Sequence, residues 1–140
     1  MKLAPVLDRI AAAQLGFRTV RGVEALASID TAPGALPAAF VVPDGFTVVG
    51  GSEGTLIIDL ETRDSFNVVI IVAGAADPDR VRDDLEGFAA AVTQLLLAWT
   101  PDSLVYRPIV PTAGRLLGIA GGRASYIINF RTSCHLRKQV

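Results

Sequence analysis

The chain has 140 residues, of which 51% are hydrophobic and 19% are charged, and its formal net charge is −1. This composition excludes a disordered chain, and the length fits a single domain over residues 1–140. The one cysteine, Cys134, excludes an internal disulfide and suits a reducing compartment. The N-terminal residues lack a signal-peptide pattern, and the longest nearly charge-free helical run, 88–99, is too short to span a bilayer. We therefore expect a soluble, intracellular protein with no membrane partner.

The N-terminal segment predicts a short amphipathic helix that is stopped by Gly16. Its apolar residues recur at helical spacing and comprise Leu3, Leu7, Ile10, Ala11 and Leu15. Residues 17–20 favour a brief extended piece. After it, Val23, Leu26 and Ala27 favour another helical turn or two.

Residues 38–42 predict a short strand, which is closed by Pro43-Asp44-Gly45, a strong turn signal. The chain then runs from Phe46 to a flexible polar tip. The tip comprises Gly50, Gly51, Ser52, Glu53 and Gly54. This glycine-rich sequence could pass for a phosphate loop, but it lacks the lysine and the following helix of that motif. We therefore interpret it as a turn.

The next segment alternates apolar and polar residues over 56–61, which predicts a half-exposed strand. Residues 66–73 are apolar on both faces apart from Asn67, as in a central strand. We favour one long bent strand for the two segments. Its first half would leave the body of the protein as part of an arm.

The longest predicted helix runs from Asp77 to Trp99, with Asp77 as N-cap and Pro78 in the first helical position. Thr100-Pro101 would end it, because a residue before proline avoids the α region. One apolar stripe follows a 3.6-residue period and comprises Val81, Leu85, Phe88, Val92, Leu95, Leu96 and Trp99. A stripe of this length requires a flat apolar cover, which the strands on either side would supply.

The C-terminal part predicts three extended segments. Residues 104–110 favour a strand that Pro108 interrupts, so that it lies at an edge or carries a bulge. Residues 115–120 favour a short extended piece, and residues 124–136 favour an alternating strand with one face on the core. The expected class is α+β, with a largely antiparallel β-sheet packed against one long helix. A short N-terminal helix and a protruding β-hairpin arm complete this prediction.

No residue pattern indicates catalysis. His135 and Cys134 are neighbours on an expected strand, so they point to opposite faces and do not form a nucleophile–base pair, and two ligands are too few for zinc. Asp83, Asp84 and Glu86 could form a cation site, but on the exposed side of a helix they are more often a solvated face. We therefore expect no enzyme, no cofactor and no metal, and interpret the chain as a binding or assembly domain.

Charge is unevenly distributed along the chain. Residues 44–86 include ten acidic and three basic residues, whereas residues 101–140 include six basic and one acidic residue. This asymmetry indicates either an ordinary solvated surface or a head-to-tail contact between copies. For the contact, the candidate subunit-interface residues are Asp59, Glu61 and Asp64 on one copy and Arg107, Arg115 or Arg131 on the next. The arginines do not favour duplex binding in a net-negative chain, but a pore that tolerates passing DNA stays open.

Several short sequences follow one another in a distinctive order. Pro-Ala-Ala-Phe-Val-Val-Pro at 37–43 precedes the polar hairpin loop, and Thr-Arg-Asp-Ser-Phe-Asn begins the central strand at 62. The long helix ends in Leu-Leu-Ala-Trp-Thr-Pro-Asp at 96–102, and Gly-Arg-Leu-Leu at 114–117 precedes the last strand. In this order of features, the whole chain resembles the tail terminator proteins of tailed phages and related phage-like particles. The Trp-x-Pro stop and the Gly-Arg-Leu-Leu hairpin are the most telling.

The resemblance implies a structural role. Such proteins form a six-membered ring on the head-proximal end of the tail tube, where the ring stops tube polymerisation and offers a joining surface to the head or neck. The implied partners are further copies of the chain, the tail tube protein and a head-completion or neck protein. DNA would pass through the lumen without specific binding, and the tip at Gly50 to Gly54 would contact the tube or neck. The implied location is the virion tail, after assembly in the host cytoplasm.

Two alternatives stay open. The chain could be another neck or tail-completion protein that also forms a ring, at a different level of the tail. It could also be a non-viral dimeric α+β domain that binds a small ligand on the same sheet.

Overall fold

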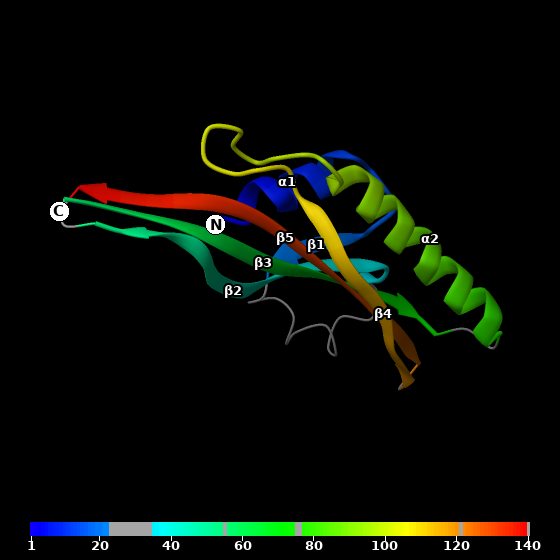
Figure 1. Ribbon diagram of the computed structural model, residues 1–140. Helices are drawn as coiled ribbons and strands as arrows, with labels where there is room; N and C mark the ends of the chain where they lie inside the picture. The colour runs from blue at the N-terminus through cyan, green and yellow to red at the C-terminus, as the bar shows by residue number, and fades with distance from the viewer. Residues whose placement is uncertain (23–34, 55, 75–76, 121, 140) are drawn as a thin grey trace.

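The computed structural model describes residues 1–22, 35–54, 56–74, 77–120 and 122–139. Figure 1 shows two helices and a long, twisted sheet. In chain order the elements are α1 (Ala4–Ala12), β1 (Thr19–Gly22), β2 (Ala38–Glu53), β3 (Ile57–Ala73), α2 (Pro78–Leu96), β4 (Val110–Ala120) and β5 (Arg123–Gln139). The helical turn expected around Val23, Leu26 and Ala27 lies outside the described residues.

The five strands form one sheet in the order β1-β2-β3-β5-β4. β2, β3, β5 and β4 pair antiparallel, whereas β1 pairs parallel to β2, so that Thr19 lies opposite Ala38. The α+β class is confirmed, and the sheet is mixed because of β1. The segments predicted at 56–61 and 66–73 form one continuous strand, as expected.

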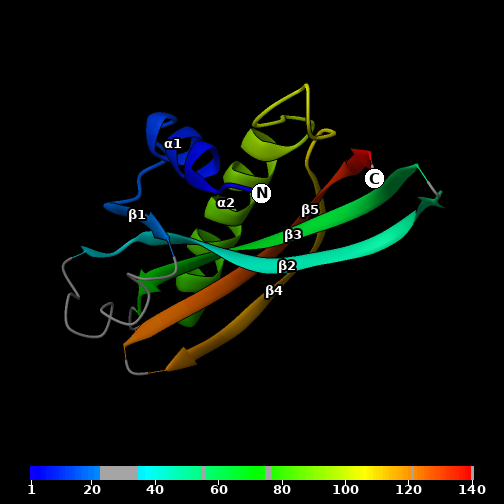
Figure 2. The same cartoon turned by 90° about the vertical axis from the view of Figure 1, so that its left-hand side faces the viewer.

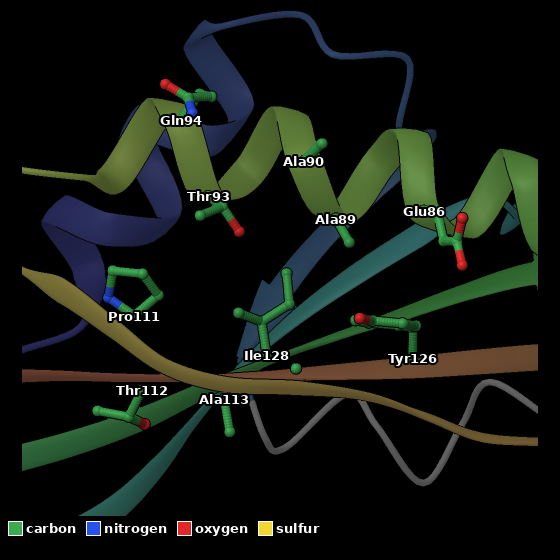
Figure 3. Close-up of a pocket in the computed structure, with 11 residues that line it drawn as sticks. Glu86, Ala89, Ala90, Thr93, Gln94, Pro111, Thr112, Ala113, Tyr126 and Ile128 are labelled. Carbon is green, nitrogen blue, oxygen red and sulfur yellow. The ribbon is translucent and has the colours of Figure 1, made fainter.

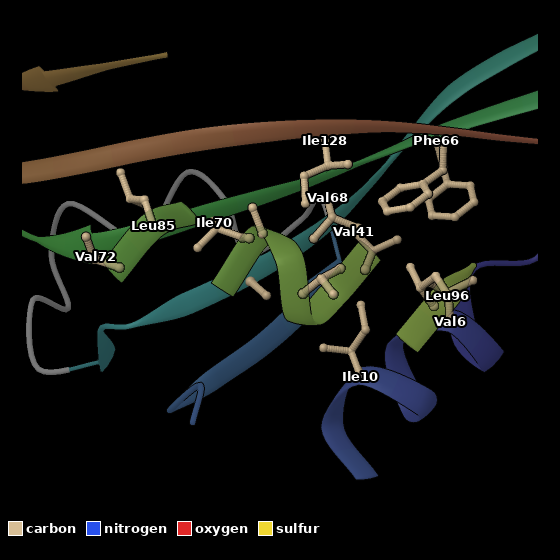
Figure 4. Close-up of a cluster of buried hydrophobic side chains, with 14 of the residues drawn as sticks. Val6, Ile10, Val41, Phe66, Val68, Ile70, Val72, Leu85, Leu96 and Ile128 are labelled. Atoms are coloured by element: carbon tan, nitrogen blue, oxygen red, sulfur yellow. The ribbon is translucent and has the colours of Figure 1, made fainter. Parts of the chain in front are cut away.

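Both helices contribute to a buried cluster on one side of the sheet (Figures 1 and 2). Figure 4 shows Leu85 and Leu96 of α2 and Ile10 of α1 in this cluster, near Val68 and Ile70 of β3. Burying such an aliphatic side chain contributes about 1.5–3 kcal/mol each, so the predicted stripe anchors α2. We call this side of the sheet the helix face. A second, smaller cluster lies on the opposite face and comprises Leu36, Ala38, Phe40 and Ile71.

Helix α2 begins as predicted but ends earlier. The Asp77 carboxylate accepts hydrogen bonds from the backbone N–H groups of Asp79 and Arg80, at 3.1 and 3.4 Å. The predicted end at Trp99 is wrong, because the last helical residue is Leu96. The N–H of Ala98, whose φ is +61°, donates to the carbonyl of Ile109 at 2.9 Å, and this long-range pairing draws the chain out of the helix before Pro101.

Strand β2 continues where a turn was expected. Pro43-Asp44-Gly45 forms a bulge, because Pro43 pairs with Phe66 and Phe46 pairs with Asp64. One extra residue is accommodated there, and Gly45 takes a φ of +84°. The predicted strand closure at Gly45 is therefore wrong. The hairpin between β2 and β3 turns only beyond Glu53.

The predicted edge strand at 104–110 is also wrong. Leu104 is 96% exposed, and a turn forms here because the N–H of Leu104 donates to the Asp102 carboxylate and the N–H of Tyr106 donates to the Asp102 carbonyl. Tyr106 makes only an isolated bridge to Cys134. The edge strand is β4, which begins at Val110 and includes the extended piece predicted at 115–120.

Candidate assembly surfaces

Three strands continue together past the two helices, as Figure 1 shows. Residues 46–53 of β2 pair with residues 58–64 of β3, and residues 57–62 of β3 pair with residues 134–139 of β5. We call residues 46–53, 57–62 and 134–139 the outer sheet. Every residue of β2 from Pro43 to Glu53 is exposed. The outer sheet therefore presents surface on both of its faces.

The helix face of the outer sheet carries large apolar side chains, with Glu53 and Lys138 at its far end. Leu136 pairs with Leu60, and Val48 pairs with Thr62, so these side chains share the face that carries the core further along the sheet. Phe46 is 66% exposed, Leu136 51% and Val48 49%. An exposed group of large apolar side chains of this kind marks an interaction surface more often than a scattered single residue does.

The opposite face of the outer sheet is charged. Asp59 pairs with Arg137, and Glu61 pairs with His135. The Asp59 carboxylate also lies 3.3 Å from Nδ1 of His135, and both side chains are about half exposed. We call this side of the whole sheet the polar face, although near the core it also carries the small apolar cluster around Phe40.

The six predicted interface residues divide between the two faces. Asp59 and Glu61 lie on the polar face, and so do Arg131, which pairs with Ser65, and Arg115, which pairs with Ile127. Asp64 lies on the helix face, 9% exposed, with its carboxylate 3.0 Å from the amino group of Met1. Arg107 is exposed in the segment before β4, and its N–H donates to the Ser133 carbonyl at 2.9 Å. The structure therefore brings Asp59 and Glu61 together and separates Asp64 from them.

The predicted tip is mostly strand. Gly50, Gly51, Ser52 and Glu53 pair with Glu61, Leu60, Asp59 and Ile58, and Gly54 follows them, its N–H donating to the Ile57 carbonyl at 2.9 Å. Gly51 has a φ of +120°, and a Cβ there would overlap the carbonyl oxygen of Asp59. A glycine is therefore required at this position.

Buried polar side chains at the base of the outer sheet were not among the residues predicted from the sequence. The Thr62 hydroxyl lies 3.0 Å from Sγ of Cys134, and the Thr132 hydroxyl donates to the carbonyl of Arg107. Burial raises the pKa of the neighbouring Tyr106, and the charges of Asp64, Cys134 and Asp102 raise it further. The signal was available in the alternation, since Thr62 and Asp64 are in phase with the core residue Phe66.

A groove of about 580 Å³ separates α2 from β4 (Figure 3). Figure 3 shows Ala89 and Thr93 pointing from α2 toward the strands, with Tyr126 below them. A Cβ at Gly114 would lie 3.1 Å from the Tyr126 hydroxyl, so this glycine leaves room for the ring. The lining residues are Glu86, Ala89, Ala90, Thr93, Gln94, Pro111, Thr112, Ala113, Gly114, Tyr126 and Ile128.

Among the residues that the structure describes, no group of three or more His, Cys, Asp or Glu side chains is placed to hold a metal ion. Neither α1 nor α2, the two helices of the described residues, is long and apolar enough to cross a membrane.

A sheet that exposes large apolar side chains on one face and charged side chains on the other is typical of a binding or assembly domain. The chain belongs to the phage tail terminator protein family, whose model matches residues 1–140. This membership assigns the protein a structural role in the tail of the virion, in association with tail and head components.

No curated protein matches the chain. Among solved structures, the chain is similar to the type 4 fimbrial biogenesis protein PilO from Pseudomonas aeruginosa, with 14% sequence identity and a TM-score of 0.22. The match covers 84% of this chain and 66% of that chain. At this TM-score the likeness supports no conclusion about fold or function.

Proposed function

We propose that the protein forms a closed ring of identical subunits, with six copies, on the head-proximal end of the tail tube. The ring stops polymerisation of the tube and presents a surface to which a head-completion or neck protein binds. Besides membership of the tail terminator family, one observation carries the proposal. The outer sheet exposes large apolar side chains on one face and charged side chains on the other, beyond the core. In the proposed ring it is the arm that reaches a neighbouring copy.

The charged residues suit a head-to-tail contact. Asp59 and Glu61 lie on the polar face of the outer sheet, whereas Arg115 and Arg131 lie on the same face of the sheet near the body. The acidic residues and the arginines occupy different places on one chain. When the acidic surface of one copy binds the arginine surface of the next, the first copy keeps its arginine surface and the second keeps its acidic surface for further copies, as a ring requires. Arg107 is a further candidate for this pairing. Asp64 is buried on the helix face and its carboxylate contacts the amino group of Met1, so its contribution is the weakest of the six.

Two further contacts complete the proposal. The residues from Gly50 to Gly54 lie at the far end of the outer sheet and contact the tube or the neck. DNA passes through the lumen of the ring without specific binding, which suits a net charge of −1 and the interspersed acidic and basic residues of the polar face.

The oligomeric state tests this proposal most directly. Mass photometry and negative-stain images of the purified protein, alone and with tail tubes, should show six-membered rings and rings at one end of each tube. A protein that stays monomeric or forms closed dimers under both conditions would contradict the ring. Rings that bind elsewhere than at the end of the tube would support the alternative of another neck or tail-completion protein.

A further inference from the structure

The groove between α2 and β4 is an exposed part of the helix face. The covering helix crosses β3 and β5, and Leu116 and Ile119, further along β4 on the same face, remain 43% and 49% exposed. Small side chains from both elements, Ala89 and Ala90 of α2 and Gly114 of β4, leave the groove open. The groove therefore has room for side chains of another surface, with apolar contacts at Ala89, Ala90 and Ile128 and polar ones at Thr93 and Gln94.

The outer sheet supplies a matching surface at the other end of the same chain. Val48, Leu60 and Leu136 form an apolar group on its helix face, and Phe46 lies beside them on β2. A protruding apolar element and an open groove at distant places on one chain match each other only between two copies. Such a contact is heterologous, so it repeats around a ring.

We propose that this groove receives the apolar face of the outer sheet of a second copy. The inference rests on the ring proposed above, and it names a contact of the helix face that is separate from the charge pairing of the polar face. Charge is complementary between Lys138 and the groove. Lys138 pairs with Ile58 at the end of the apolar face, and Glu86 lies at one end of the groove with Asp83 and Asp84 nearby on α2. In the contact, Lys138 of one copy lies beside Glu86 of the next.

Cross-linking between two variants tests which surfaces meet. A Leu136→Cys protein is mixed with a Thr93→Cys protein and treated with a short bis-maleimide, with wild type as the control for the buried Cys134. His135→Cys is the matched control for Leu136→Cys, because it is the adjacent, similarly exposed residue on the polar face. We expect the Leu136→Cys mixture to give at least about tenfold more cross-linked dimer than the His135→Cys mixture. Equal yields would overturn the proposal.

A substitution that fills the groove tests its role in assembly. Thr93→Arg places a long charged side chain in the groove, and Gly87→Arg adds the same side chain to α2 where nothing lies within 4 Å. We expect Thr93→Arg to raise the protein concentration for half-assembly by at least about tenfold, and Gly87→Arg to leave it within about twofold. Circular dichroism melting curves establish that both variants fold.

The outcomes separate this inference from the ring itself. A folded Thr93→Arg protein that assembles like wild type contradicts docking in the groove while the ring stands. A Thr93→Arg ring that loses tube binding assigns the groove to the tail tube protein, and this also overturns the proposal. Wild-type protein that never assembles, with or without tubes, contradicts the ring and therefore both proposals.

Discussion

The hydroxyl of Thr62 and the sulfur of Cys134 lie 3.0 Å apart on adjacent strands, and both residues are buried. The same hydroxyl lies 3.3 Å from the carbonyl oxygen of Cys134. This contact joins β3 to β5 where the outer sheet leaves the core. We expect Thr62→Val, which keeps the shape and removes the hydroxyl, to lower the free energy of unfolding by about 1 kcal/mol. Thr47→Val on the exposed β2 should change it by less than about 0.5 kcal/mol. Urea denaturation measures both, and equal effects would show that the contact contributes nothing.

Tyr106 should make the protein sensitive to alkaline pH. Burial and the charge of Asp64 raise the pKa of its hydroxyl, so the folded state keeps the proton longer than the unfolded state does. The stability that the neutral phenol contributes is complete below about pH 10 and is lost as the pH rises through the higher folded-state pKa. We expect Tyr106→Phe to weaken the fall in melting temperature between pH 9 and pH 11. Tyr126→Phe is the control. A fall that is unchanged in Tyr106→Phe would be evidence against this linkage.

Charge reversal tests the proposed pairing on the polar face. We expect Glu61→Arg to weaken assembly, because two like charges would then meet across the contact, and Asp8→Arg on α1 to change the net charge equally without this effect. Combining Glu61→Arg with Arg115→Glu should restore the ring. Mass photometry at 50 mM and 300 mM salt measures each variant, with the largest differences at low salt. Rings of unchanged size and stability in Glu61→Arg would exclude the pairing.

Shortening the far end of the outer sheet tests its contact with the tube or neck. Ser52 and Asp59 are paired, so replacing residues 53–58 with Asn-Gly closes the hairpin with a two-residue turn and keeps Asp59. We expect this variant to form normal rings but to give over-long or headless tails in an assembly reaction. Ser52→Ala, which keeps the length, is the control. Tails of normal length and attachment would remove these residues from the interface.

The elements that depend on local periodicity were predictable. The stripe from Val81 to Leu96 identified α2, and the alternation around Ile128 and Phe130 identified the buried face of β5. Asp77 and Pro78 fixed the beginning of the helix because capping is local.

The errors involve long-range pairing. The end of α2 depends on a hydrogen bond from the N–H of Ala98 to the carbonyl of Ile109, and the residues next to Ala98 do not predict this bond. The separation of Asp64 from Asp59 and Glu61 is different, because it follows from the alternation of side chains along the single strand β3. The groove was not predictable, because it depends on how far α2 lies from β4.

The bulge in β2 has a consequence for how side chains are sorted along this strand. Pro43 and Phe46 lie three residues apart and yet pair with Phe66 and Asp64, which point the same way. Without the extra residue, the alternation beyond Gly45 would run in the opposite phase. Phe46 and Val48 would then lie on the polar face with Glu61 and Arg63, and Thr47 would lie on the helix face. The bulge thus holds these two large apolar side chains on the side of the sheet that carries the core.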